Sequence, residues 1–181
     1  MSEAIGNVDS MADHWIPTSE AALQQAIANG TFEENHHVEA KREFATGSAK
    51  NKEMARDLAG LAIDGGVLII GVAELKDIQS WRCEPLPLQG LGERIEQVVQ
   101  QLIHSPLPVR ARTFPAAGDP TLGYVAVEVP ASPQAPHMVD NIYYARGEKT
   151  KRRLGDAEVR TYLAAHRDLG EQIHDLLSIV P

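Results

Sequence analysis

The chain has 181 residues, of which 43% are hydrophobic and 23% are charged. This length and this balance suit one folded domain with a tail, and they exclude disordered and fibrous proteins. No apolar run approaches the ~18 residues that span a bilayer, and the N-terminus lacks the basic and apolar segments of a secretory signal. Cys83 is the only cysteine and cannot form an internal disulfide. We therefore expect a cytoplasmic protein with no membrane partner.

The net charge of −8 is unevenly distributed along the chain. Residues 1–39 contain seven acidic residues and no Lys or Arg, whereas the other 142 residues contain 18 acidic and 17 basic residues. Local potential governs the binding of a polyanion more than total charge does, so the nearly neutral body can present a basic face. The acidic balance alone therefore does not exclude nucleic acid as a partner.

The N-terminal half of the chain shows both helical and strand patterns after a flexible acidic lead, residues 1–17. In chain order, we expect a helix over 19–29, a strand within 36–44, a polar loop over 46–52, a helix over 50–63, a strand over 67–72 and a loop over 75–90. Thr18 or Ser19 can cap the first helix, and Asn29-Gly30 closes it. The β-branched content of 67–72 favours a buried strand, and Pro85, Pro87 and Gly90 break the segment after it.

The C-terminal half begins with a clear amphipathic helix and continues into strands. In chain order, we expect a helix over 91–103, strands over 109–114 and 122–129 around a turn at 116–121, a short strand near 142–145 and a helix capped by Asp156. A tail over 168–181 carries Ile173, Leu176, Leu177 and Val180, which can form a second short helix. The domain itself spans 18–167, and the sum of these elements predicts an α+β fold with a central mixed β-sheet flanked by helices.

Three sequence blocks stand in order along the chain: residues 34–41 (ENHHVEAK), residues 65–72 (GGVLIIGV) and residues 143–147 (YYARG). In turn, they resemble the E-x4-E-F-K motif, the GG-x-hydrophobic-GV strand and the YY-x-R-x-G segment of the Schlafen AlbA_2 family. Residues 127–132 (VEVPAS) resemble the V-x-VP-x-S strand end before the last block. The resemblance covers roughly residues 20–165. It implies an AlbA_2-like fold, nucleic-acid binding, and, in some members, metal-dependent endoribonuclease activity on structured RNA such as tRNA.

The resemblance also implies a set of catalytic residues. Glu34, Glu39 and Glu74 match the three carboxylates of nuclease members, although Glu74 stands where those members carry Asp. Clustered carboxylates bind Mg²⁺ or Mn²⁺, which can orient a phosphate and activate the attacking group. Lys41 then either holds a phosphate or pairs with Glu39. The alternative is that these are ordinary surface side chains.

A second candidate surface is a run of bases that follows two tyrosines. The bases are Arg146, Lys149, Lys151, Arg152 and Arg153. They can contact phosphates while the ring of Tyr144 stacks on a base, or they can form a solvated loop before the last helix. His36 and His37 point to opposite faces of a strand and are better explained as surface residues than as metal ligands. Gly65-Gly66 lacks the Lys-Ser/Thr of a phosphate-binding loop and is better explained as a turn.

The sequence thus favours a nucleic-acid-binding domain for RNA or DNA, extended by divalent-metal-dependent endoribonuclease activity if Glu34, Glu39 and Glu74 share an ion. The alternative is a non-catalytic DNA- or RNA-binding regulator or a protein-interaction module. The lobes of the family act in pairs, and the apolar tail offers a surface that a monomer need not bury. We therefore also expect a homodimer.

Overall fold

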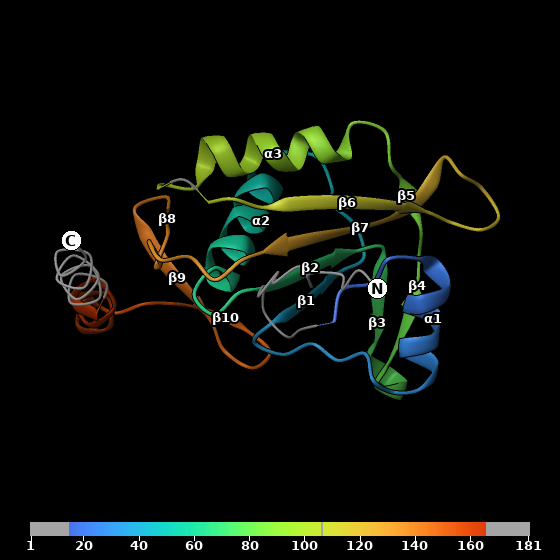
Figure 1. The fold of residues 1–181 in the computed structure, drawn as a ribbon, viewed down its shortest axis with the longest axis horizontal. Helices are drawn as coiled ribbons and strands as arrows, with labels where there is room; N and C mark the ends of the chain where they lie inside the picture. Colours follow the sequence, from blue (N-terminus) through green and yellow to red (C-terminus); the bar gives the residue numbers. More distant parts are fainter. Residues whose placement is uncertain (1–14, 106, 166–181) are drawn as a thin grey trace, which may run out of the picture.

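The computed structural model describes residues 15–105 and 107–165, built around one mixed sheet (Figure 1). The five strands of this sheet are Val38–Lys41 (β1), Gly66–Ile70 (β2), Leu86–Pro87 (β5), Arg110–Pro115 (β6) and Leu122–Val129 (β7). Their order is β1-β2-β7-β5, with β6 also paired to β7. Strands β1 and β2 are parallel and the other pairs are antiparallel. The predicted α+β class with a central mixed sheet is confirmed.

Helices cover both faces of the sheet, which explains why every residue of β2 is buried. Successive side chains of a strand point to opposite faces. Leu68 and Ile70 therefore pack in the core formed with Ser48–Leu61 (α2) and Leu91–Leu102 (α3). Val67 and Ile69 face the opposite core, to which Leu23 of Glu20–Ala28 (α1) contributes. Burial on both faces is the physical reason for the unbroken apolar run in the sequence.

Two small sheets extend the body at its two ends (Figure 1). Val72–Leu75 (β3) pairs with Ser80–Cys83 (β4) across a short 3-10 turn, Lys76–Ile78 (η1). The second small sheet consists of Met138–Val139 (β8), Ile142–Arg146 (β9) and Lys151–Arg153 (β10) in the order β10-β9-β8. The antiparallel β9–β10 hairpin packs against α2 and carries the whole of the predicted basic run.

The structure confirms the first three predicted helices and moves two boundaries. The Ser19 hydroxyl caps α1 by accepting a hydrogen bond from the Ala22 N–H at 3.2 Å, and α2 begins at Ser48, inside the expected polar loop. The strand expected over 67–72 is interrupted at Gly71, where φ is +105° and a Cβ would lie 2.7 Å from the Tyr124 ring. The loop expected over 75–90 was wrong, because β4 and β5 lie within it.

The last described element is a helix over 156–165. It starts directly at Asp156, so Gly155 occupies the capping position that had been assigned to Asp156. The Glu158 carboxylate accepts a hydrogen bond from the Gly155 N–H at 3.0 Å, which is one half of a capping box. The acidic lead up to residue 14 and the tail helix expected around Ile173 lie outside the described residues. Within the described ranges, no helix is long and apolar enough to cross a bilayer.

Candidate nucleic-acid interface

The side chains of strand β1 alternate between the two faces of the sheet, with two side chains on each face. Val38 and Ala40 join the apolar core on the α1 side of the sheet. Because side chains alternate along a strand, Glu39 and Lys41 face the opposite side, toward α2. Glu39 is 6% exposed, and a carboxylate so far from water needs charged or hydrogen-bonding partners.

Five charged side chains meet on the α2 side of β1, and we call them the buried charge network. They are Glu39, Lys41, Asp57, Arg146 and Lys151. The Lys41 ammonium lies 2.5 Å from a Glu39 oxygen and 3.3 Å from an oxygen of Asp57. The network thus alternates in sign from Arg146 through Glu39, Lys41 and Asp57 to Lys151. Each carboxylate has two cationic neighbours.

The two ends of the buried charge network come from the β9–β10 hairpin. The Arg146 guanidinium donates to the second carboxylate oxygen of Glu39, and the Lys151 ammonium donates to Asp57 at 2.7 Å. Arg146 and Lys151 face each other across the hairpin in the strand register. The hairpin is therefore attached to β1 through one strand and to α2 through the other.

Burial and ion pairing have opposite effects on the pKa values of the side chains in the buried charge network. Burial raises the pKa of the Asp57 carboxyl above its ordinary value, and the charges of Lys41 and Lys151 only partly oppose this. Burial alone would lower the pKa of Lys41, but the carboxylates of Asp57 and Glu39 outweigh it and raise that pKa. Lys41 is therefore a charged partner of Glu39, one of the two roles that the sequence left open for it.

Glu34 and Arg146 also complete the open edge of β1. The Glu34 carboxylate accepts a hydrogen bond from the Ala40 N–H at 3.0 Å. Arg146 donates to the carbonyl oxygens of Asn35 at 2.7 Å and Val38 at 2.9 Å. Burial raises the pKa of Glu34, more than its hydrogen bond to the Ala40 N–H lowers it. The side chain thus has a structural role in addition to any role toward a ligand.

The structure does not gather the three predicted metal ligands into one group. Glu34 and Glu74 line a pocket of about 280 Å³, together with Lys149 and Trp81. Glu39 is not part of that lining, and its two oxygens are paired with Arg146 and the Lys41 ammonium. Among the described residues, no group of three His, Cys, Asp or Glu side chains is arranged to hold a metal ion. The predicted Mg²⁺ or Mn²⁺ set of Glu34, Glu39 and Glu74 therefore does not fit this arrangement.

The predicted basic run divides into buried and exposed members. Arg146 has a side chain that is 3% exposed, and Lys151 is half-buried against Asp57. Tyr144 is 5% exposed and lies beneath the Arg56 guanidinium, so its ring is not available for stacking on a base. Both side chains are thus buried in the structure, and their assignment to nucleic-acid contacts stays a prediction.

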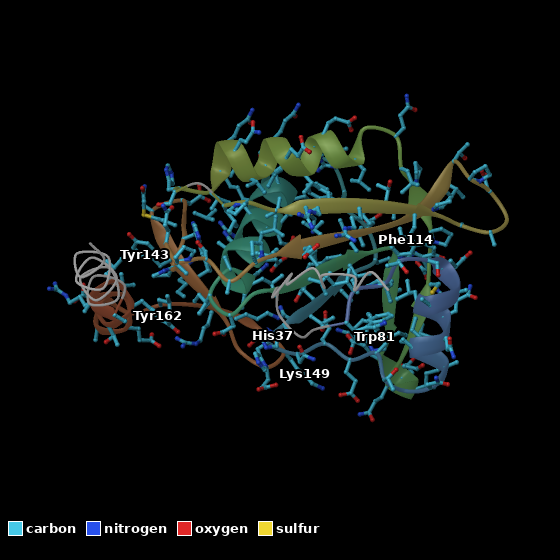
Figure 2. All side chains as sticks on the ribbon, in the orientation of Figure 1. His37, Trp81, Phe114, Tyr143, Lys149 and Tyr162 are labelled. Atoms are coloured by element: carbon cyan, nitrogen blue, oxygen red, sulfur yellow. The ribbon has the colours of Figure 1, made fainter. Side chains whose placement is uncertain are left out.

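Three cations of the run remain exposed, and we call Lys149, Arg152 and Arg153 the exposed basic set. Arg152 forms a surface ion pair with Glu158 at 2.7 Å, and such pairs contribute little in water. Lys149 lies at the tip of the hairpin, where Figure 2 labels it at the lower edge of the molecule. Tyr143, on the same hairpin, is half-buried.

Asp57, the second carboxylate of the buried charge network, was not among the residues predicted from the sequence. It lies in α2 with Met54, Leu58 and Leu61, which pack in the core, and is itself 3% exposed. An acidic residue on the apolar stripe of a helix signals a buried ion pair, because an unpaired buried carboxylate is costly. The sequence contains this signal, but it does not show which cations pair with Asp57.

The family assignment rests on residues 34–155, which contain both β1 and the β9–β10 hairpin. These residues match the family described as Schlafen, AlbA_2. The chain belongs to the Schlafen AlbA_2 family. The match includes every member of the buried charge network and of the exposed basic set. It also confirms the resemblance seen in the three sequence blocks.

Two solved structures are similar to the chain at low sequence identity. The DIP2311 protein from Corynebacterium diphtheriae aligns with a TM-score of 0.51 and 19% identity, over 81% of this chain and 28% of its own. The N-terminal domain of a RecG-related protein from Nitrosomonas europaea aligns with a TM-score of 0.49 and 20% identity, over 74% of this chain and 86% of its own. The first likeness shows the fold alone. No curated protein shows significant similarity to the chain.

Proposed function

We propose that this AlbA_2 domain binds nucleic acid through the phosphate backbone, and that the exposed basic set on the β9–β10 hairpin makes the contacts. The observation that carries the proposal is the way the hairpin is attached. Its two strands are joined to β1 and α2 by buried ion pairs, while Lys149, Arg152 and Arg153 face solvent. Membership in the AlbA_2 family supports the same ligand class.

The attachment of the hairpin to β1 and α2 fixes the positions of the exposed basic set. Within the loop of the hairpin, the Gly147 N–H donates to the Thr150 carbonyl at 2.8 Å. After β10, the Leu154 N–H donates to the Tyr143 carbonyl at 2.9 Å, so backbone pairing continues past Arg153. Three cations at fixed separations can contact successive phosphates, whereas cations on a loose loop would first have to be ordered.

Contacts of this kind do not read sequence. Phosphate contacts set the orientation and the affinity of a protein on nucleic acid, and base edges supply the sequence information. The buried ring of Tyr144 cannot add a base contact. We therefore expect binding to both RNA and DNA, with an affinity that falls steeply as the salt concentration rises.

The arrangement favours the non-catalytic alternative over endoribonuclease activity. In the part of the chain that the structure describes, Glu34 and Glu74 share a pocket that does not include Glu39. Lys41, the fourth candidate catalytic residue, is held between two carboxylates. Binding without cleavage is the function that these contacts support best.

The test is a double substitution of the exposed basic set with a matched control. Lys149→Ala/Arg153→Ala should weaken binding to fluorescein-labelled tRNA and to duplex DNA in an anisotropy titration. On duplex DNA, it should reduce the slope of log affinity against log salt by about 0.9 per lost contact. The control, Lys50→Ala/Arg110→Ala, removes the same charge from exposed positions on α2 and β6. Equal weakening in both double variants would show that only net charge matters and would overturn the assignment.

A further inference from the structure

A second pocket lies where the end of β1 meets α2, beside the buried charge network. Its volume is about 80 Å³, several times the roughly 10–15 Å³ that one water molecule needs. Phe44, Met54 and Leu68 give it apolar walls. Lys41 and Asp57, both members of the buried charge network, also line it. We call this cavity the Asp57 pocket, and it shares no lining residue with the pocket of Glu34.

One oxygen of the Asp57 carboxylate lacks a hydrogen bond. The side chain is 2% exposed, and its Oδ1 atom accepts from the Lys151 ammonium at 2.7 Å. The Oδ2 atom is buried and accepts no hydrogen bond from any residue that the structure describes. The Lys41 ammonium lies 3.3 Å from Oδ2, but its short contact, at 2.5 Å, is with Glu39. Because a buried oxygen without a donor is costly, a donor from a bound molecule would stabilise it.

Asp57 and Lys41 together offer two complementary groups to a ligand. The Oδ2 atom of Asp57 is an acceptor, and the Lys41 ammonium, 3.3 Å away, has three N–H donors to share. The edge of a nucleobase carries a donor next to an acceptor, and its flat faces suit apolar walls. The rest of the lining includes Lys50 and Glu53, which pair with each other at 3.0 Å. A neutral planar group therefore fits this pocket.

The charges of the pocket disfavour a phosphate group. The lining carries two lysines and three carboxylates, the third being Glu43. A phosphate would lie beside the Asp57 carboxylate and be repelled by it. The cations that suit phosphates lie next to the pocket instead, because Lys151, which bonds to Asp57, is followed directly on β10 by Arg152 and Arg153. A strand on these two arginines would have its bases close to the pocket.

We propose that the Asp57 pocket takes one unpaired nucleobase of a nucleic-acid strand whose phosphates contact the exposed basic set. The base donates to Asp57 and accepts from Lys41, while Phe44 and Met54 contact its ring. This inference rests on the proposed function and adds a base contact to it. A base inside a duplex is paired and stacked, so it must leave the helix before it can enter a pocket. The domain should therefore prefer single strands that carry bases.

The first test compares two single strands with the same number of phosphates. One is fluorescein-labelled oligothymidylate, and the other is a strand of equal length made of abasic sites. In an anisotropy titration, wild-type protein should bind the oligothymidylate about tenfold more tightly, as expected for one base held against an aromatic ring. Equal affinities would overturn the base pocket and leave phosphate binding in place. Failure to bind either strand would overturn the proposed function and this inference with it.

The second test fills the pocket without removing a charge. Ala45 lines the pocket, and Ala45→Leu adds three carbon atoms there. The variant should lose the preference for oligothymidylate over the abasic strand and keep the affinity for duplex DNA, which also shows that it is folded. The matched control is Ala49→Leu, at an exposed position of α2, and it should keep the preference. A preference that survives Ala45→Leu, or that both variants lose, would overturn the proposal.

The third test uses wild-type protein and changes the edge of the base. In thymine, the N3–H donor lies between two carbonyl acceptors, and methylation at N3 removes the donor. An oligonucleotide of N3-methylthymine should therefore bind no more tightly than the abasic strand, since nothing donates to Asp57. Binding as tight as that of unmodified oligothymidylate would show that the base does not use this carboxylate, which overturns the proposal.

The fourth test distinguishes a base in a strand from a free nucleoside. Thymidine carries the same ring without the phosphates, so it should displace labelled oligothymidylate only at a concentration far above that of unlabelled oligothymidylate. Displacement by both at the same concentration would assign the Asp57 pocket to free nucleosides and overturn the proposed strand contact.

Discussion

The buried charge network and the exposed basic set use the same hairpin in different ways. In the network, Arg146 and Lys151 are turned inward and satisfy the carboxylates of Glu39 and Asp57. In the exposed set, Lys149 and Arg153 face solvent. The comparison shows that a run of bases in a sequence need not form one surface, because burial of individual side chains decides which cations remain available to a ligand.

The largest effect is expected from removing the arginine of the network. Arg146→Ala leaves the Glu39 carboxylate buried with one of its two cations missing, and it also removes the donors to Asn35 and Val38. Breaking a buried ion pair in this way costs about 3–5 kcal/mol. Urea unfolding should show this loss, whereas Arg153→Ala in the exposed set should stay within about 0.5 kcal/mol of wild type. Equal effects of the two variants would erase the distinction between the regions.

A double substitution separates two effects of losing Arg146: the cost of an unpaired buried carboxylate and the loss of the Arg146 hydrogen bonds to β1. Glu39→Leu/Arg146→Met replaces both members of the pair with apolar side chains of similar size and leaves Lys41 paired with Asp57. Replacing both partners is often neutral, whereas removing one is not. The double variant should therefore regain at least about 2 kcal/mol relative to Arg146→Ala in the same urea titration. If it is as unstable as Arg146→Ala, the hydrogen bonds of Arg146 to β1 dominate instead.

A smaller effect on stability is expected from the ionisation of the Glu34 carboxyl as the pH changes. Burial raises its pKa in the folded protein above the ordinary 4.5. Between these two values the folded state binds more protons than the unfolded state, so stability falls as the pH rises through that window. Glu34→Gln keeps an oxygen that can accept from the Ala40 N–H and removes the charge. It should gain about a few tenths of a kcal/mol at pH 7 and flatten the curve above pH 4.5. A steeper curve in the variant would contradict this sign.

The smallest expected effect is that of metal removal. The exposed basic set binds phosphates directly, so EDTA should change the affinity for tRNA by less than about twofold, near the scatter of such measurements. In the same preparation, tRNA should remain intact with Mn²⁺ or Mg²⁺. Cleavage that is lost in Glu39→Gln would show that the carboxylates regroup around an ion and would restore the endoribonuclease prediction.

The sequence predicted most of the fold because its periodicities report burial directly. The amphipathic helix at 91–103 follows the helical period and the strand at 122–129 is a mostly apolar run, and both were confirmed. Short paired segments were missed. The hydrogen bonds of β5 depend on β7, a partner distant in sequence. Strand β10 pairs with the neighbouring β9, but its three residues, like the two of β5, are too few to show a period.

The candidate site could be predicted only in part, for a related reason. The resemblance located Glu34, Glu39, Lys41 and the basic run, but not which charges meet. A sequence cannot show that Arg146 crosses to β1, because that contact joins residues 107 positions apart. The sequence also does not show which side chains are exposed. Tyr143 and Tyr144 are neighbours, yet Tyr144 is buried and Tyr143 is only half-buried.

The hydrogen bonds along the outer side of β1 have a consequence for solubility. This strand ends one side of the main sheet, and an unpaired strand edge invites a strand from another molecule, which is a route to aggregation. Here the Ala40 N–H is already taken by Glu34, and the Val38 carbonyl by Arg146. An incoming strand would have to displace an acidic and a basic side chain. Residues that the family resemblance marks as functional thus also keep β1 from recruiting further strands.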